Sequence, residues 1–223
     1  MPEHEPDSTD AVGSFFDSYA SAFDSLYGHA ESRGPVGRWI DRRFRSVMRV
    51  RFEEVLALCA NPDIRTIIDI GCGPGRYLVE FARMGKTCVG VDLSDEMLGI
   101  ARQLAERVDH LANIDLVQGD YLQEAFKTPF DSACLMGFFD YVEHPEAILK
   151  KLRNDVTGEI WASFPKAGGL LAFQRKIRYR MRRCPLWFYD EAEVHRLMWA
   201  CGYGYHYTIK NLGRDFFVRA RVE

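Results

Sequence analysis

Short runs of β-branched and apolar residues alternate with amphipathic helical patterns from residue 64 onward. The runs predict strands at 66–70, 87–92, 114–118, 131–136 and 158–164. Helical patterns follow the first, second and fourth of these runs. Such alternation predicts an α/β fold, with a parallel sheet and helices on both of its faces.

The two ends of the chain have different patterns. At the C-terminal end, Asp190 and Glu193 indicate a capped helix. Strands predicted at 203–209 and 215–221 follow so closely that they must form a hairpin, which makes the last strand antiparallel. At the N-terminal end, aromatic residues at helical spacing and a second amphipathic pattern predict helices within 13–62. We expect residues 1–12 to be a disordered tail and residues 63–223 to form the sheet domain.

Composition narrows the class of protein. The chain has 223 residues, of which 47% are hydrophobic and 27% are charged, as in ordinary globular proteins. It contains no apolar run of transmembrane length and no basic, apolar N-terminal leader, so we expect a cytoplasmic protein. The six cysteines have no zinc-like spacing, so we predict no metal site and mostly buried free thiols. The net charge of −3 disfavours a protein that coats nucleic acid.

The strongest motif is the segment DIGCGPG at 69–75, between a predicted strand and a predicted helix. Open α/β sheets bind ligands at such a position. The third glycine comes one place too early for the dinucleotide pattern GxGxxG, and the GK[ST] ending of a P-loop is missing. The loop therefore does not predict a pyrophosphate ligand. Asp69, at the end of the strand, suits a ligand that carries an amine.

Acidic residues follow the next two predicted strands. Asp92 stands 21 positions after Gly71, where a carboxylate can bind both hydroxyls of a ribose. Asp120 can accept a hydrogen bond from an adenine amino group, and Tyr121 or Leu122 can pack on the ring. The three strand ends together predict a site for an adenosine joined to an amino acid.

In these motifs the sequence resembles the class I S-adenosylmethionine-dependent methyltransferases that act on small molecules. The matching segments are DIGCGPG (69–75), VGVDLS (89–94), QGDY (118–121) and residues 130–149. The resemblance implies a Rossmann-like, doubly wound, seven-stranded mixed sheet whose last strand is antiparallel. It also implies an N-terminal helical cover, S-adenosyl-L-methionine as the cofactor, and methyl transfer by in-line displacement.

The resemblance also implies roles for individual residues. Those expected at the methionine part of the cofactor are Asp69, Gly71, Cys72, Gly73, Gly75 and Gly137. Those expected at the adenosine part are Asp92, Leu93, Asp120 and Tyr121, and Tyr19 is expected to cover the cofactor.

The acceptor side is predicted from two further features. Asp140, Tyr141 and His144 follow the fourth strand and are candidate bases, needed only if the acceptor is a protonated group; a structural role for His144 stays open. The basic insertion 166–188 has seven Lys or Arg and no acid between 166 and 183. Three of its arginines at helical spacing are candidates to bind a small acidic acceptor: Arg175, Arg178 and Arg182.

Other readings remain open at this stage. The insertion also fits a solvated helix, or contact with a membrane surface or an acidic carrier protein. RNA binding is disfavoured, because no module of stacking aromatic residues accompanies the charges. The alternative functions are a nicotinamide-dependent oxidoreductase, which the early third glycine opposes, and a non-catalytic protein that binds S-adenosylmethionine or RNA. The sequence leaves the acceptor atom and the oligomeric state open.

Overall fold

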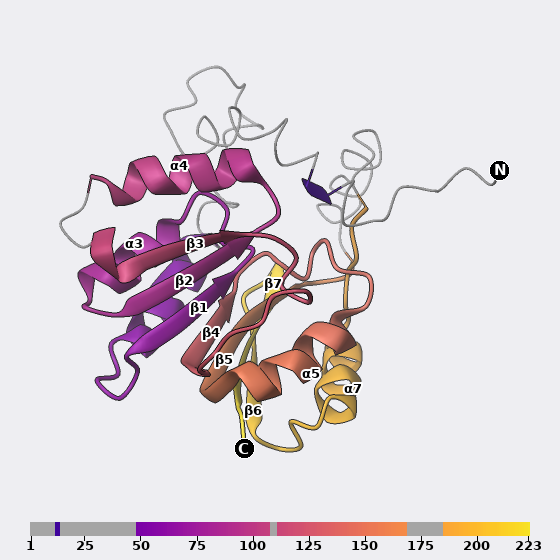
Figure 1. Ribbon diagram of the computed structural model, residues 1–223. Helices are drawn as coiled ribbons and strands as arrows, with labels where there is room; N and C mark the ends of the chain where they lie inside the picture. Colours follow the sequence, from indigo (N-terminus) through magenta and orange to yellow (C-terminus); the bar gives the residue numbers. More distant parts are fainter. Residues whose placement is uncertain (1–11, 14–47, 108–110, 169–184) are drawn as a thin grey trace.

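A computed structural model describes residues 12–13, 48–107, 111–168 and 185–223. Its centre is a seven-stranded sheet with the order β3-β2-β1-β4-β5-β7-β6 (Figure 1). The strands are β1 (Thr66–Ile70), β2 (Thr87–Asp92), β3 (Ile114–Gln118), β4 (Phe130–Leu135), β5 (Val156–Pro165), β6 (Tyr207–Asn211) and β7 (Asp215–Arg221). β1 to β5 are parallel, and β7 is antiparallel to both of its neighbours. The predicted mixed sheet is confirmed.

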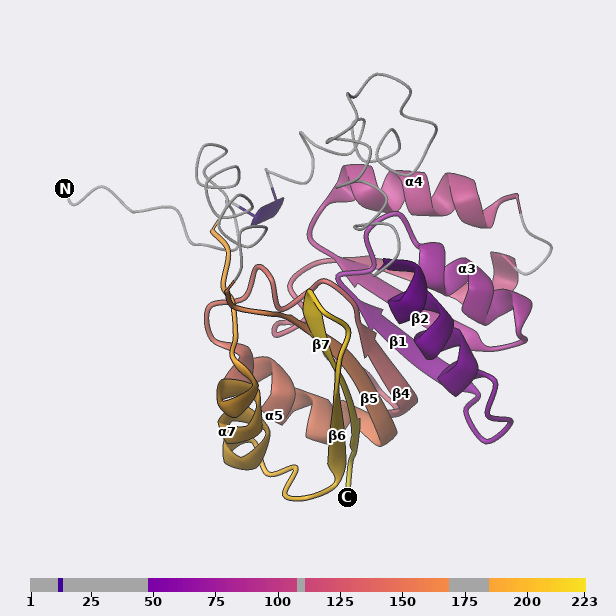
Figure 2. The same ribbon diagram turned by 180° about the vertical axis from the view of Figure 1, so that it is seen from behind.

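Helices cover both faces of this sheet, as the two views in Figures 1 and 2 show. One face is covered by α3 (Arg76–Arg83), α4 (Asp95–Ala105) and the helical residues 48–59. The other face is covered by α5 (Pro145–Asp155) and α7 (Glu191–Ala200). A short 3-10 turn, η1 (Leu111–Asn113), precedes β3. The doubly wound arrangement is therefore confirmed.

Capping residues fix where two of these helices begin. The Ser94 hydroxyl accepts a hydrogen bond from the Met97 N–H at 3.1 Å and caps α4. Asp190 and Glu193 form the capping box predicted at the start of α7, with N–H to oxygen distances of 2.6 and 2.7 Å. Each cap satisfies N–H groups that have no partner within the helix.

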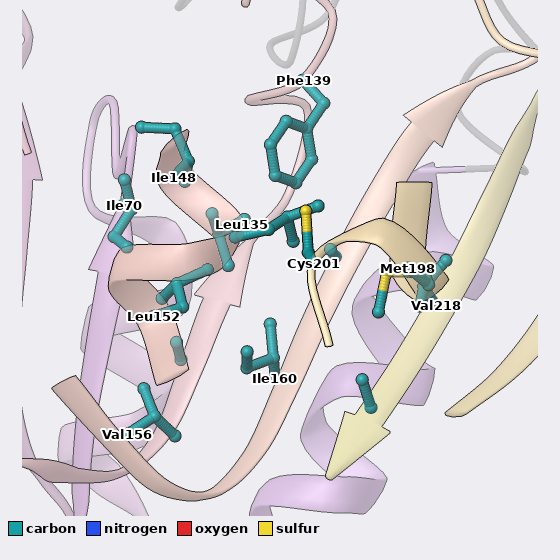
Figure 3. Close-up of a cluster of buried hydrophobic side chains, with 14 of the residues drawn as sticks. Ile70, Leu135, Phe139, Ile148, Leu152, Val156, Ile160, Met198, Cys201 and Val218 are labelled. Carbon is teal, nitrogen blue, oxygen red and sulfur yellow. The ribbon is translucent and has the colours of Figure 1, made fainter. Parts of the chain in front are cut away.

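The larger hydrophobic core lies between the sheet and the α5–α7 face. Figure 3 shows Ile148 and Leu152 of α5 and Met198 of α7 among side chains of the central strands. Phe139, which follows β4, stacks on Phe164 of β5 with ring centroids 4.5 Å apart. This packing holds the ends of β4 and β5 together at one edge of the sheet.

The predicted strand at 203–209 is wrong in its first half, since β6 begins at Tyr207. Tyr203 is fully buried, and its hydroxyl donates to the Leu149 carbonyl oxygen at 2.7 Å. Gly202 and Gly204 on either side have positive φ values of +84° and +53°, which strands do not use. Because Tyr203 is buried between two glycines with positive φ, β6 begins only at Tyr207.

The described residues also bear on two other expectations. Val12 is helical and buried, although the sequence predicted a disordered tail through residue 12. The five described cysteines, Cys59, Cys72, Cys88, Cys134 and Cys201, are free and buried, as predicted. Among the described helices, none has the length and apolar character needed to span a membrane.

Candidate functional site

The glycine loop leaves the carboxyl end of β1 near the middle of the sheet. Gly71 and Gly73 have positive φ values of +68° and +52°, a backbone conformation that glycine adopts without steric cost. The N–H groups of Gly71 and Cys72 donate to the Val91 carbonyl oxygen at 2.8 and 3.2 Å. These hydrogen bonds fix the loop against β2.

The two glycines face different surroundings. A Cβ atom at Gly71 would lie 2.7 Å from Cδ2 of Phe138, so a side chain there would clash with the protein. A Cβ atom at Gly73 would meet no atom of the described residues within 4 Å. The loop backbone is therefore open at Gly73, where a ligand has room to approach.

Asp92 ends β2 and reaches across to the glycine loop. Its Oδ2 accepts a hydrogen bond from the Gly73 N–H at 2.8 Å, and its Oδ1 accepts one from the Ser94 N–H at 3.0 Å. Two backbone donors therefore orient this half-buried carboxylate beside the open part of the loop. That is the placement that a ribose-binding acid needs.

Asp69 is almost completely buried at the end of β1, with 1% of its surface exposed. Its Oδ2 has no hydrogen-bond partner among the described residues. Burial raises the pKa of this carboxyl to about 7, a hydrogen bond from the Cys134 thiol opposes the rise, and the charge of Asp92 adds to it. A buried acid with an unpaired oxygen is suited to a cationic ligand group.

Arg51 lies beside the candidate site and was not predicted from the sequence. Its guanidinium is buried at the same edge of the sheet, where Nη1 donates to Ser163 Oγ at 3.1 Å and to Asp215 Oδ2 at 3.2 Å. A Cβ atom at Gly137 would lie 3.7 Å from its Nη2. The sequence did contain an indication of this. Arg51 stands three residues after Met48 and four before Val55, so it lies on the apolar side of the predicted helix.

Gly137 follows β4 and lies beside Arg51. It has a φ of +77°, and its N–H donates to Ser163 Oγ at 2.8 Å. The Ser163 hydroxyl thus contacts both the guanidinium and the turn after β4. The structure brings Gly137, predicted at the methionine part of the cofactor, to the same edge as the glycine loop.

The candidate bases lie on the loop between β4 and α5. Asp140 is buried, and its carbonyl oxygen accepts a hydrogen bond from the Trp187 N–H at 3.0 Å. Tyr141 is half-buried. His144 is exposed and stands at the N-cap position of α5, where its side chain makes no capping hydrogen bond. A role for His144 as a helix cap is thus unsupported.

The residues predicted at the adenine have different positions. Leu93 is half-buried, and a Cβ atom at Gly13 would lie 3.6 Å from its Cβ, so the N-terminal segment reaches this part of the site. Asp120 is half-buried, and its Oδ1 accepts the Leu122 N–H at 3.0 Å. Both residues lie next to strand ends on the glycine-loop side of the sheet.

Tyr121 is placed differently from the prediction. Only 2% of its surface is exposed, and its hydroxyl donates to Oδ2 of Asp155 at 2.7 Å. Phe126 stacks on the ring, and Lys151 Nζ lies 4.5 Å from the ring centre. These contacts leave the ring almost no surface for an adenine. The predicted adenine contact of Tyr121 is therefore wrong: its ring packs in the core, and its hydroxyl is bound by the half-buried Asp155 of α5.

Some predicted residues fall elsewhere. Tyr19, Arg175, Arg178 and Arg182 lie outside the described residues. Cys72 is buried in the loop, and burial raises the pKa of its thiol well above the usual value. Its thiol is therefore neutral and packs inside the protein.

Comparisons with known proteins relate the middle of this chain to methyltransferases. A family model described as a methyltransferase domain matches residues 67–156. The ubiquinone biosynthesis O-methyltransferase of Hydrogenovibrio crunogenus is 26% identical over 100 residues, which are 45% of this chain and 42% of that protein. The probable (S)-tetrahydroprotoberberine N-methyltransferase 2 of Papaver bracteatum is 28% identical over 92 residues, 40% of this chain and 25% of that protein. The chain thus spans less than half the length of these two relatives.

The fold has close counterparts among solved structures. The crystal structure of magnesium protoporphyrin IX methyltransferase from Synechocystis PCC 6803 with bound SAH has a TM-score of 0.75. The two sequences are 18% identical, and the match covers 96% of this chain and 99% of that one. Residues 67–156 thus match a methyltransferase domain, and the sheet has the fold of a methyltransferase that binds SAH. At the start of the matched region, the buried Asp69 has a carboxyl oxygen with no hydrogen-bond partner among the described residues.

Proposed function

We propose that this methyltransferase transfers the methyl group of S-adenosylmethionine to a small anionic acceptor by in-line displacement. The observation that carries the proposal is the buried, unpaired carboxylate oxygen of Asp69 next to the backbone-held carboxylate of Asp92. One acid is suited to an ammonium group and the other to ribose hydroxyls. A dinucleotide has no ammonium group to match Asp69, which argues against the oxidoreductase alternative.

Four groups of the chain form the proposed cofactor site. Asp69 pairs with the amino group, the Arg51 guanidinium binds the carboxylate, and Asp92 binds the ribose. The open backbone at Gly73 lets the cofactor approach the loop. When bound, the cofactor supplies a methyl group that its sulfonium already activates.

Further contacts are proposed from position alone. Six further residues at the same edge of the sheet are proposed to contact the cofactor: Gly71, Cys72, Gly75, Leu93, Asp120 and Gly137. Tyr121 is left out of the proposed site because its side chain is committed to the core.

The anionic character of the acceptor is inferred from cations at the ends of β5 and β7. Lys166 follows β5 and is half-buried, with its Nζ 5.5 Å from the centre of the Phe216 ring. Its N–H donates to the carbonyl oxygen of Arg214 at 2.8 Å, so two cationic residues are adjacent. The basic sequence 166–183 continues from this point. Positive side chains beside the reaction site favour a carboxylate or phosphate on the acceptor.

The chain contributes mainly orientation and exclusion of water. Holding two reacting atoms in line can lower a barrier by roughly 7–11 kcal/mol. An acceptor that is already a carboxylate needs no base. For a hydroxyl acceptor, we propose that Asp140, Tyr141 or His144 removes the proton, because all three lie on the loop that follows β4.

The test is a methyl-transfer screen with S-adenosylmethionine that carries a deuterated methyl group. The acceptors are small aromatic and aliphatic carboxylates and phosphates, each matched with a neutral amide or alcohol of the same shape. We expect mass spectrometry to find the deuterated methyl group on anionic acceptors only, and the Asp92→Ala variant to be inactive. Transfer to the neutral partners alone would refute the acceptor class, and no transfer to any acceptor would refute the reaction.

A further inference from the structure

Arg51 is anchored through one of its two terminal nitrogens. It comes from the helical residues 48–59, which cover the face of the sheet that carries α3 (Figure 2). Its Nη1 donates to Ser163 Oγ at 3.1 Å and to Asp215 Oδ2 at 3.2 Å. A guanidinium is planar and rigid, so two hydrogen bonds at Nη1 also fix the direction of Nη2. The orientation of this cation is therefore set by residues of β5 and β7.

The Ser163 hydroxyl has a fixed position inside the sheet. Ser163 lies on β5 between β4 and β7, is paired with Phe217 of β7, and is buried. Its Oγ also accepts a hydrogen bond from the Gly137 N–H at 2.8 Å. A hydroxyl oxygen has two lone pairs, so the donors from Arg51 and Gly137 use both. Ser163 thus joins the guanidinium and the turn after β4 into one hydrogen-bonded unit.

Asp215 supplies the charge that balances Arg51. The two side chains are 6% and 11% exposed, so their ion pair is almost completely buried. A guanidinium buried without an opposite charge would be very costly, which makes Asp215 necessary for the placement of Arg51. Ser163 is neutral and contributes direction without charge. A substitution at Ser163 therefore changes how the guanidinium is held but leaves its ion pair in place.

The terminal nitrogens of Arg51 face the turn at Gly137. A Cβ atom at Gly137 would lie 3.7 Å from Nη2, and this glycine is only half-buried, so a ligand can approach the turn. Nη2 also donates to Met48 Sδ at 3.0 Å, and a thioether is a weak acceptor. A carboxylate is a stronger acceptor that also attracts the positive charge. A carboxylate at this turn would therefore displace Met48 as the partner of Nη2.

We infer that Ser163 is a positioning residue that directs the Arg51 guanidinium toward the carboxylate of the cofactor's amino-acid part. This role rests on the proposed function, because it needs the cofactor at the edge of the sheet where Gly137 lies. Ser163 itself touches no ligand in this account and acts only through Arg51. A side chain that is already held in one orientation loses less entropy when it binds, so the positioning strengthens the contact with the carboxylate.

The alternative role for Ser163 is purely structural. Its hydroxyl would then only satisfy two buried donors, and its loss would weaken the binding of every ligand of the site to the same extent. A positioning role predicts a loss that is confined to ligands with a carboxylate. S-adenosylmethionine and decarboxylated S-adenosylmethionine differ only in this group, so together they distinguish the two roles.

The test is calorimetric titration of the full chain with these two compounds. We expect the wild type to prefer S-adenosylmethionine by about thirtyfold, because the decarboxylated form lacks a hydrogen bond between charged groups. Ser163→Ala should bind S-adenosylmethionine about tenfold more weakly, and its affinity for the decarboxylated form should change by no more than about twofold. Ser163→Cys keeps the shape of the side chain but has a weaker acceptor, and it should show the same selective loss.

Ser132→Ala is the matched control. Ser132 is another buried serine of the sheet, on the neighbouring strand β4, and its Oγ makes no hydrogen bond with the described residues. The variant loses the same hydroxyl from the interior without changing a contact of Arg51. We expect it to bind both compounds like the wild type.

Several results would overturn the inference while leaving methyl transfer standing. They are an equal loss of affinity for both compounds in Ser163→Ala, an unchanged affinity for S-adenosylmethionine in that variant, and the same selective loss in Ser132→Ala. Equal affinity of the wild type for both compounds would also refute the proposed contact of Arg51. If urea unfolding shows that Ser163→Ala does not fold, Ser163→Cys decides by the same criteria. Absence of S-adenosylmethionine binding by the wild type would instead overturn the proposed function, and this inference with it.

Discussion

Replacing Asp69 by asparagine is expected to stabilise the protein and to weaken cofactor binding. Burial raises the pKa of this carboxyl from 3.8 to about 7, so the folded protein resists its ionisation. A shift of this size corresponds to roughly 4 kcal/mol, at 1.36 kcal/mol for each pKa unit. Asparagine removes this cost but buries an amide with an unpaired donor, which costs about 1–3 kcal/mol. The expected net gain in unfolding free energy above pH 7 is about 1–3 kcal/mol.

The pH dependence of stability follows from the same shift. The folded state holds the Asp69 proton up to about pH 7, whereas the unfolded chain loses it near 3.8. The contribution of Asp69 to stability therefore falls as pH rises between these values, and it is lost in full above about pH 7. Urea unfolding of Asp69→Asn and of the wild type at pH 5 and pH 8 measures this contribution to the unfolding free energy. The gain from the substitution should be clearly larger at pH 8.

The affinity for the cofactor should rise with pH, whereas the contribution of Asp69 to stability falls. If the ionised carboxylate pairs with the cofactor's ammonium group, the wild type must lose a proton before it binds. From pH 5.5 to pH 7.0 the affinity for S-adenosylmethionine should rise roughly fifteenfold, while Asp69→Asn should bind weakly with little pH dependence. The reasoning is refuted if Asp69→Asn is less stable than the wild type at pH 8, or if wild-type affinity is flat over this range.

Three further predictions concern other parts of the site. Arg51→Met should lower the unfolding free energy by about 3–5 kcal/mol, because it removes the guanidinium that pairs with the buried carboxylate of Asp215, and should weaken binding of S-adenosylmethionine; urea unfolding and calorimetry measure both. Gly71→Ala should unfold at a lower temperature than Gly73→Ala, since within the described part of the chain only the new methyl group at position 71 clashes, with Phe138, whereas Gly73→Ala should lose cofactor affinity while staying folded. Tyr121→Phe should cost about 1–3 kcal/mol of stability through the lost hydrogen bond to Asp155, and should leave cofactor affinity within twofold of the wild type; a large loss of affinity would return this ring to the site.

Local patterns were sufficient to predict most of the fold. The β-branched runs and the Ser94 and Asp190 caps predicted strands and helix starts that the structure confirms. The error at 203–209 arose because Tyr203 has the residue type of a strand but is held by a contact with Leu149, far away in the sequence. A local sequence pattern cannot reveal such a contact between residues that are far apart in the chain.

The positions of the candidate site residues were predictable where these residues stand at strand ends. Asp69, Asp92 and Gly137 lie where the order of strands places them, since parallel strands end at one edge of the sheet. Arg51 was missed because its partners, Ser163 and Asp215, come from β5 and β7, more than a hundred residues away in the chain. Only the three-dimensional packing shows that its charge is buried beside the site.

Titration calorimetry with S-adenosylmethionine tests the central claim most directly. The wild type should bind one cofactor molecule per chain and should show no binding of NAD. Asp92→Ala should bind about a hundredfold more weakly, because two hydrogen bonds from ribose hydroxyls to a charged acceptor are lost. No heat with S-adenosylmethionine, or equal affinity in the wild type and Asp92→Ala, would contradict the account.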